Sequence, residues 1–354
     1  MTSPAAPAPA AVRAALQRLS QGLGLTEPET QAAFEEIMAG RVSAVAIAGL
    51  LMGLRGKGES AEEIAGAVRA LRGAMRTVKH PQPHRLVDTC GTGGGKVTTI
   101  NISTAAAFVA AGAGVPIAKH GNRSFTSRSG SADVLEALGV AIDADPERAA
   151  EILAEAQIVF LFAPAYHPAM RHVGPVRAEL GAATLMNLIG PLANPAGVSR
   201  QVVGVSDPAK APRVAEALAR LGSEHALVVH ADVGMDEISP MGLSTAWEVA
   251  NGAVREWRID PAELGQATDS LEGLSGGSAA ENAERIEALL ATPATAPAAL
   301  RAAVVLNAAA AVLVSGLARS MADAASRAAG ALNDGSAYAR LNALRRAAPR
   351  RQAP

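Results

Sequence analysis

The stretch Asp88-Thr-Cys-Gly-Thr-Gly-Gly-Gly-Lys-Val-Thr-Thr-Ile-Asn-Ile-Ser-Thr104 places a glycine-rich turn between two elements of different periodicity. The run Arg85–Thr89 at its start predicts a strand, and the pattern Ser103–Ala113 at its end predicts a helix. Glycines let backbone amides approach an oxyanion, and a helix N-terminus adds the positive end of its dipole. The stretch therefore predicts a phosphate-binding turn in an α/β domain, with a glycine-rich turn that binds no ligand as the alternative.

The glycine spacing disfavours two common classes of phosphate-binding protein. Val97 follows Lys96 where a Walker motif needs a hydroxyl residue, and the glycines at 91, 93, 94 and 95 lack the dinucleotide-binding spacing. A nucleoside triphosphatase and a nicotinamide-dependent enzyme are therefore disfavoured.

Short apolar runs alternate with longer helical patterns over residues 84–345. Four more strands are expected at Pro116–Lys119, Ile158–Leu161, Val202–Val205 and Ala226–His230. A helix is expected over Ala132–Leu138, and the alanine-rich tail from Ala279 to Arg345 returns to helix. This alternation is typical of a large α/β domain with a central, largely parallel sheet flanked by helices.

Residues 12–79 carry apolar side chains at helical spacing and predict a small all-helical domain. Thr26 and Ser60, each followed by acidic residues, are expected to begin helices because their side-chain oxygens cap free amides. The Ala- and Pro-rich residues 1–11 are expected to form a disordered tail, and His80–Pro83 a linker between the domains.

Length, charge and cysteine content narrow the class of protein. The chain has 354 residues, enough for two domains of roughly 100–200 residues each. With 32 Lys and Arg against 33 Asp and Glu, the net charge of −1 gives no general attraction to nucleic acid or to an anionic membrane. The apolar runs 44–54 and 302–318 fall short of the ~20 residues that span a bilayer and are expected to be buried helices. The single cysteine, Cys90, favours the reducing cytoplasm.

A second polar stretch, Lys119-His-Gly-Asn-Arg-Ser-Phe-Thr-Ser-Arg-Ser-Gly-Ser131, follows one of the expected strands. Two arginines, one lysine and five hydroxyl residues form a set of donors suited to a phosphate or diphosphate. Because open α/β sheets bind ligands at the carboxyl ends of their strands, the stretch predicts a second phosphate loop. A solvated basic loop is the alternative.

Two adjacent carboxylates, Asp236 and Glu237, follow the expected strand Ala226–His230. Beside two phosphate loops they predict a magnesium site between protein oxygens and diphosphate oxygens, to which Ser103 adds a neutral ligand. An exposed acidic turn is the alternative.

The segment His167–Arg177 is expected to be a helix, with Arg171 and Arg177 on different faces. A guanidinium that points inward from this segment would clamp a carboxylate with two hydrogen bonds. Ordinary surface arginines are the alternative.

Together, these segments resemble the anthranilate phosphoribosyltransferase family, within the nucleoside phosphorylase/phosphoribosyltransferase superfamily, from about Leu25 to Leu344. The motifs that carry the resemblance are Lys57-Gly-Glu59, Glu62-Glu-Ile-Ala-Gly66, Gly91-Thr-Gly-Gly94, Asn101-Ile-Ser-Thr104, Lys119-His-Gly-Asn-Arg123, Asn187-Leu-Ile-Gly-Pro-Leu192, Asn194-Pro195 and Asp236-Glu-Ile-Ser239. The chain departs from the family's usual pattern at Gly95, where an acidic residue is common, and at Ala183 and Met186, where arginine and phenylalanine are common.

The resemblance implies transfer of the phosphoribosyl group of 5-phosphoribosyl 1-pyrophosphate to the amine of anthranilate, the second step of tryptophan biosynthesis from chorismate. It also implies one or two Mg²⁺ ions and a homodimer formed through the small domain, which helices near 168–195 are expected to join. Two alternatives on the same fold are a pyrimidine nucleoside phosphorylase and a non-catalytic paralogue that binds nucleic acid.

The resemblance further implies roles for individual residues. The implied magnesium ligands are Ser103, Asp236 and Glu237. The implied contacts to anthranilate come from Gly91, Asn122 and Arg177. The residues implied for phosphoribosyl pyrophosphate are Gly91, Gly94, Gly95, Thr99, Asn101, Ile102, Ser103, Thr104, Lys119, His120, Gly121, Asn122, Arg123, Ser124, Phe125, Thr126, Ser127 and Ser131. No residue is a certain catalyst, and His120 is expected at most to assist by hydrogen bonding.

Overall fold

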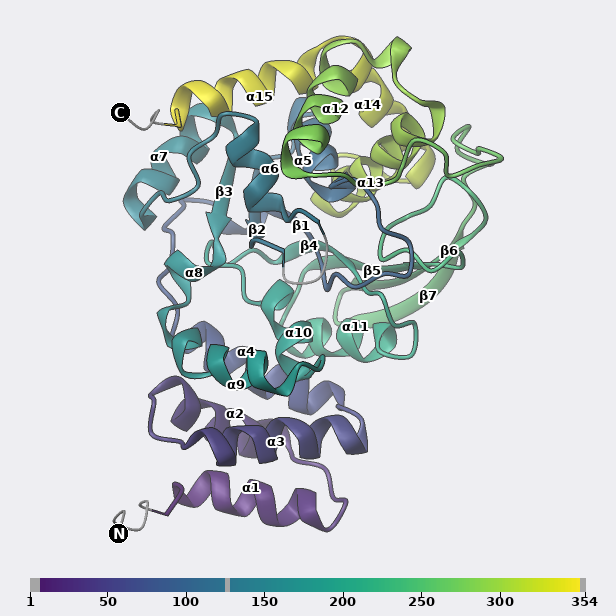
Figure 1. Cartoon of the computed structure of the whole chain (residues 1–354). Coiled ribbons are helices and arrows are strands. Elements are labelled where there is room, and N and C mark those ends of the chain that lie inside the picture. The colour runs from purple at the N-terminus through teal and green to yellow at the C-terminus, as the bar shows by residue number, and fades with distance from the viewer. Residues whose placement is uncertain (1–6, 125–127, 351–354) are drawn as a thin grey trace.

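The computed structural model describes residues 7–124 and 128–350. A seven-stranded sheet lies at the centre of the molecule, with one group of helices on one side and the N-terminal helices on the other (Figure 1). The small helical unit and the large α/β unit predicted from the sequence are therefore both present.

The N-terminal unit contains α1 (Ala10–Ser20), α2 (Glu27–Met38), α3 (Ala44–Lys57) and α4 (Ala61–Gly73). Thr26 and Ser60 cap α2 and α4 as predicted, because each side chain accepts a hydrogen bond from the third helical amide, Glu29 or Glu63. The expected tail is too long, since α1 already begins at Ala10; residues 1–6 lie outside the described chain.

The strands are β1 (Val87–Gly91), β2 (Ile117–Gly121), β3 (Ile158–Phe162), β4 (Arg200–Gly204), β5 (His225–Ala231), β6 (Ser244–Ala250) and β7 (Ala253–Ile259). They are ordered β3-β2-β1-β4-β5-β6-β7. The first five run parallel, and β6 and β7 continue the sheet as an antiparallel hairpin. The sequence predicts β1 to β5 within two residues but misses the hairpin, because β7 is exposed along most of its length and lacks a clear apolar alternation.

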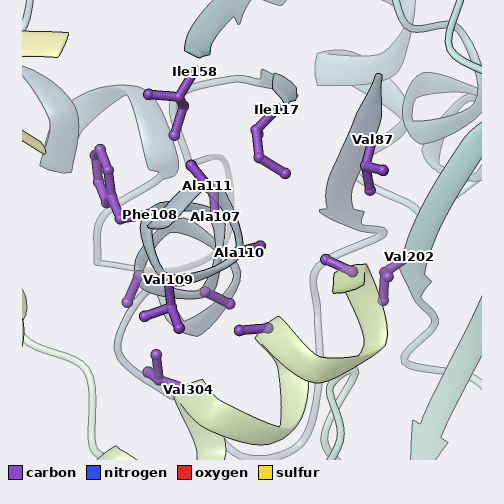
Figure 2. Close-up of a cluster of buried hydrophobic side chains, with 14 of the residues drawn as sticks. Val87, Ala107, Phe108, Val109, Ala110, Ala111, Ile117, Ile158, Val202 and Val304 are labelled. Carbon is purple, nitrogen blue, oxygen red and sulfur yellow. The ribbon is translucent and has the colours of Figure 1, made fainter. Parts of the chain in front are cut away.

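One face of the sheet is covered by α5 (Ile102–Gly112) and α13 (Ala298–Ser315), with α14 (Met321–Asn333) and α15 (Ser336–Ala347) packed against α5. Figure 2 shows Phe108 and Val109 of α5 and Val304 of α13 gathered with Val87, Ile117, Ile158 and Val202 of four strands. Helix α13 has the length and hydropathy of a membrane span, but 83% of it is buried inside the protein, which is the environment of a core helix. Other described helices are α6 (Ser131–Ala137), α7 (Pro146–Ala156), α12 (Ala279–Ala291), η1 (Pro83–Arg85), η3 (Gly190–Leu192) and η4 (Pro293–Thr295).

The opposite face carries α11 (Ala211–Arg220), which packs against β5 and β6 on one side and α4 on the other. Val203 and Val228 of the sheet share a core with the N-terminal helices. The buried carboxylate of Glu59 also pairs with Lys210 at the start of α11, at 3.2 Å. The helical unit is therefore fixed to the sheet through one intervening helix.

The segment expected to be one helix, His167–Arg177, is broken. It begins directly after α8 (Ala163–Tyr166) and contains the 3₁₀ turn η2 (Pro168–His172) and the first part of α9 (Gly174–Leu180). Pro168 and Pro175 explain the breaks, since proline lacks an amide donor and disfavours helical geometry in the preceding residue. Helix α9 packs against α3, and α10 (Leu185–Ile189) packs against α4.

The contact between α2 and α4 makes a prediction about stability. A Cβ atom at Gly66 would lie 2.9 Å from Thr30 Cβ and closer still to the carbonyl of Glu27, whereas nothing lies within 4 Å of one at Gly73. We expect Gly66→Ala to lower the free energy of unfolding by about 1–3 kcal/mol because the two helices must separate. Gly73→Ala, in the same helix, is expected to leave the free energy of unfolding unchanged or slightly higher. Urea unfolding of both variants tests this, and equal effects would contradict it.

Candidate active site at the carboxyl ends of the parallel strands

Four polar segments meet at one edge of the sheet. The glycine-rich turn follows β1, the basic stretch follows β2, the segment with Ser206 follows β4, and Asp236 and Glu237 follow β5. The four strands are parallel, so their carboxyl ends lie at the same edge, which is where open α/β sheets bind ligands.

The glycine-rich turn is held by backbone contacts from two sides. Thr92 N donates to Gly204 O at 2.8 Å, and Lys96 N donates to Gly234 O at 3.0 Å. Between them, Gly93 and Gly94 have φ angles of +67° and +79°, a region that favours glycine. These backbone bonds fix the turn, and the Thr92 hydroxyl adds a side-chain contact by accepting a hydrogen bond from Ser206 N at 3.2 Å.

Asp236 lies directly against this turn. Cβ atoms at Gly91 and Gly95 would stand 3.2 Å and 3.0 Å from its two carboxylate oxygens. Burial raises the pKa of Asp236. Burial and the neighbouring charge of Asp236 raise the pKa of Glu237 to about 8, although Thr99 Oγ1 donates to Glu237 at 3.1 Å. Among the described residues, no lysine, arginine or histidine forms an ion pair with either carboxylate, so their oxygens are donor atoms for a divalent cation, whose binding would displace the protons that the raised pKa values favour.

The residues after the acidic pair are fixed by a helix from the far end of the chain. Asn307 of α13 accepts a hydrogen bond from Ile238 N at 3.0 Å and donates to Ile238 O at 2.9 Å. Asn307 also lines a small cavity with Cys90, Ser103 and the two acids. In the sequence, Asn307 is only a polar residue within an apolar run. In the structure its side chain is buried, and this burial indicates a structural role.

Lys119, at the start of the basic stretch, contacts both β1 and α5. Its buried side chain donates to the carbonyl of Thr89 and to Ser103 Oγ, the latter at 3.3 Å. Burial lowers its pKa, which the nearby carboxylates of Asp88 and Glu237 oppose. The ammonium group therefore lies between β1 and the first turn of α5.

Asp88, inside β1, positions the residue after Lys119. Its Oδ1 accepts a hydrogen bond from His120 N at 3.1 Å, and its Oδ2 accepts one from Asn194 at 2.8 Å. Asn194 also donates to Ala118 O at 2.8 Å. Burial raises the pKa of Asp88 to about 6. Neither residue was singled out as functional from the sequence, although a carboxylate inside an apolar strand is itself a signal of a buried polar role.

Arg123 turns toward α6. Its guanidinium pairs with Asp133 at 2.7 Å and Glu136 at 2.6 Å, and it lies 5.6 Å from the centre of the Phe162 ring. Ser131 Oγ donates to Asn122 O at 3.3 Å and closes the loop. Three residues expected in this site, Phe125, Thr126 and Ser127, lie outside the described residues.

His120 packs against His167, with the ring centres 5.1 Å apart. Burial lowers the pKa of His120 to about 3 and that of His167 to about 4. Both rings are therefore neutral near pH 7. His120 Nε2 is buried and has no hydrogen-bond partner among the described residues.

The two arginines of the segment after β3 differ in their surroundings. Arg171 is exposed, whereas Arg177 of α9 is half-buried, and burial lowers its pKa. Over residues 7–124 and 128–350, no hydrogen bond or ion pair is formed by the Arg177 guanidinium, and none joins it to Asn122 or Gly91. Of the two, Arg177 is the partly buried arginine, and its donors are left for an anion.

Two family descriptions match the chain. The glycosyl transferase family a/b domain matches residues 83–338, and the helical bundle domain of the same family matches residues 13–75. The two matched ranges correspond to the large α/β unit and the N-terminal helices.

Individual relatives cover almost the whole length. The anthranilate phosphoribosyltransferase of Rubrobacter xylanophilus is 50% identical over 330 residues, which are 93% of this chain and 95% of that one. The solved structure of anthranilate phosphoribosyltransferase from Thermus thermophilus is 43% identical, with a TM-score of 0.86 over 94% of this chain and 99% of that one. The Saccharomyces cerevisiae enzyme, solved in complex with PRPP and Mg, is 25% identical, with a TM-score of 0.86 over 96% and 98% of the two chains. On its motifs, its fold and these relatives, the chain belongs to the anthranilate phosphoribosyltransferase family.

Proposed function

We propose that this chain transfers the phosphoribosyl group of 5-phosphoribosyl 1-pyrophosphate to the amine of anthranilate, giving N-(5-phosphoribosyl)anthranilate and diphosphate in the second step of tryptophan biosynthesis. The observation that carries the proposal is the meeting, at one edge of the sheet, of the glycine-rich turn, the basic loop and two carboxylates that form no ion pair within the described chain. The family relationship supplies the two substrates.

The donor substrate lies, in this proposal, over the glycine-rich turn and the basic loop. Backbone amides of the turn and the ammonium group of Lys119 offset negative charge on the diphosphate as the C1–O bond lengthens toward an oxocarbenium-like state. The proposed donor site comprises Gly91, Gly94, Gly95, Thr99, Asn101, Ile102, Ser103, Thr104, Lys119, His120, Gly121, Asn122, Arg123, Ser124, Phe125, Thr126, Ser127 and Ser131.

Magnesium fits the acidic pair. Asp236 and Glu237 offer adjacent carboxylates without an ion-pair partner in the described chain, and Thr99 accounts for one oxygen of Glu237. We assign Asp236, Glu237 and Ser103 to one or two Mg²⁺ ions; the Saccharomyces cerevisiae relative with PRPP and Mg supports the assignment. When bound, the cation stabilises charge on the diphosphate oxygens.

The acceptor site is assigned to Arg177, Asn122 and Gly91. A half-buried guanidinium without a partner in the described residues suits the carboxylate of anthranilate. The aromatic amine is unprotonated near pH 7, so its attack on C1 needs no strong general base. The neutral ring of His120 can accept or donate a hydrogen bond there, but it does not supply a cationic acid.

We also propose a homodimer formed through the small domain, made of residues 12–79 and the helices near 168–195. Val45 and Met52, one face of α3, are 83% and 40% exposed, and Leu23 of the same unit is 46% exposed. A second copy that packs on this face of α3 would cover Val45 and Met52.

The transferase assignment is tested by anthranilate fluorescence over time. The signal is expected to fall only when protein, phosphoribosyl pyrophosphate and magnesium are all present, because the product no longer carries the free amine. A folded protein that leaves the fluorescence unchanged in the complete mixture would overturn the proposal. Asp236→Asn with Glu237→Gln is expected to reduce turnover by about 100-fold or more. It should also abolish the rise in melting temperature caused by magnesium and donor together.

The matched control removes two charges from an exposed place. Glu151 and Glu155 of α7 have side chains that are 62% and 56% exposed, so Glu151→Gln with Glu155→Gln is expected to keep the wild-type rate. A fully active Asp236→Asn, Glu237→Gln protein would refute the metal assignment.

Arg177→Ala is expected to raise the KM for anthranilate about 10- to 100-fold, because a charge-assisted pair of hydrogen bonds is lost. The KM for the donor should change little. Arg171→Ala, at the exposed arginine of the same segment, serves as the control and should keep both constants within about twofold. Unchanged anthranilate kinetics in Arg177→Ala would remove this residue from the site.

Light scattering coupled to size exclusion tests the dimer. Wild-type protein is expected to elute as a dimer, and Val45→Glu as a monomer, because a carboxylate would be buried without a partner. Val254→Glu makes the same change on β7, where the side chain is 37% exposed, and should remain a dimer. A monomeric wild-type protein at micromolar concentration would contradict the proposal.

A further inference from the structure

A segment after the β6–β7 hairpin lies against the glycine-rich stretch. Ile100 N donates to Leu274 O at 2.8 Å, and Gly276 N donates to Thr98 O at 3.2 Å. These bonds form an isolated antiparallel bridge between Thr99 and Ser275. We call residues 271–278 the strap.

The strap is held from behind by two residues of α12. Asn282 Oδ1 accepts a hydrogen bond from Gly277 N at 2.8 Å. Arg285 donates to Ser275 O at 2.6 Å and also to the carbonyl of Gly273. Since residues three apart lie on the same face of a helix, α12 presents both side chains to the strap together.

The amide group of Asn282 also binds two residues outside the strap. Its Nδ2 donates to Asn101 Oδ1 at 3.0 Å and to Ser129 Oγ at 2.9 Å. Asn101 in turn donates to Ser129 O at 3.3 Å. Asn282 is 1% exposed, so all three of its hydrogen bonds are made out of contact with bulk water. One side chain thus connects the strap, the start of α5 and the end of the basic loop.

The position of Asn101 gives this contact its significance. Asn101 is the N-cap residue of α5, and asparagine there normally bonds to amides of the first turn. Here its side chain makes no capping bond, because it is turned toward Ser129 and Asn282. The backbone amides at the start of α5 are therefore left without a side-chain cap from Asn101.

We propose that Asn282 is a positioning residue for the phosphoribosyl pyrophosphate site. It touches the two loops assigned to the donor, fixes their spacing and keeps the Asn101 side chain away from the helix N-terminus. This inference rests on the proposed function, since it names what holds the donor loops rather than what binds the donor.

The variant Asn282→Asp distinguishes the proposed positioning role from a role in packing alone. The carboxylate keeps the shape of the side chain and the acceptor for Gly277 N, but it loses both donors. We expect the KM for phosphoribosyl pyrophosphate to rise about tenfold, and kcat and the KM for anthranilate to change less than about threefold. Asn333→Asp makes the same chemical change at the exposed end of α14 and should match wild type.

Amide hydrogen exchange of the substrate-free protein gives a second, independent measurement. Peptides covering residues 98–104 and 128–131 should exchange faster in Asn282→Asp than in wild type or Asn333→Asp, because the bonds between the loops are gone. Folded Asn282→Asp with unchanged exchange and an unchanged donor KM would overturn the inference.

If Asn282→Asp does not fold, Arg285→Ala provides the test. Arg285 is half-buried, and its removal takes away the hydrogen bond to Ser275 O that holds the same strap. A raised donor KM supports the inference, and an unchanged one overturns it. Failure of the proposed function gives a different result, because wild-type protein would then show no transfer from phosphoribosyl pyrophosphate. The hydrogen-exchange experiment would still report whether Asn282 holds the loops.

Discussion

The buried carboxylate of Asp88 is the contact on which the site's geometry depends. It lies inside β1, and its two oxygens bind the first part of the basic loop and Asn194. Burying a carboxylate is costly unless its oxygens are paired, so the loops around Asp88 must keep their hydrogen-bonding groups in place. Three segments far apart in the sequence are thereby fixed at the point where the parallel strands end.

Around this contact, the site gathers one lysine and two carboxyl groups that form no ion pair with other described residues. Lys119 is buried beside Ser103, and Asp236 and Glu237 lie partly buried against the glycine-rich turn. In a protein of 32 basic and 33 acidic residues, this local separation of charge, and not the net charge, marks the place where a charged ligand is stabilised. A helix from the C-terminal part of the chain supports it, through Asn307 of α13.

The parts of the fold and site that follow from the sequence are those encoded within short windows. Strands β1 to β5, the caps at Thr26 and Ser60 and the two loops after β1 and β2 depend on neighbouring residues. Local patterns do not predict the β6–β7 hairpin, because its outer strand is largely solvent-exposed. They also predict one helix over His167–Arg177, which Pro168 and Pro175 divide. The side-chain direction of Arg123 and the role of Asn282 depend on partners 10 or more positions away, which no local pattern contains.

The hairpin that ends the sheet has one more consequence. In the strand order of the described chain, β7 is the last strand, so one row of its backbone groups is unpaired within the sheet. Such an edge is a template for pairing with another chain. Arg255, Glu256 and Arg258 put charges of both signs along it, and Arg255 also stands over the Trp257 ring. These charged side chains disfavour pairing of β7 with the edge strand of another molecule. The sheet can therefore end at an open edge without promoting aggregation at high protein concentration.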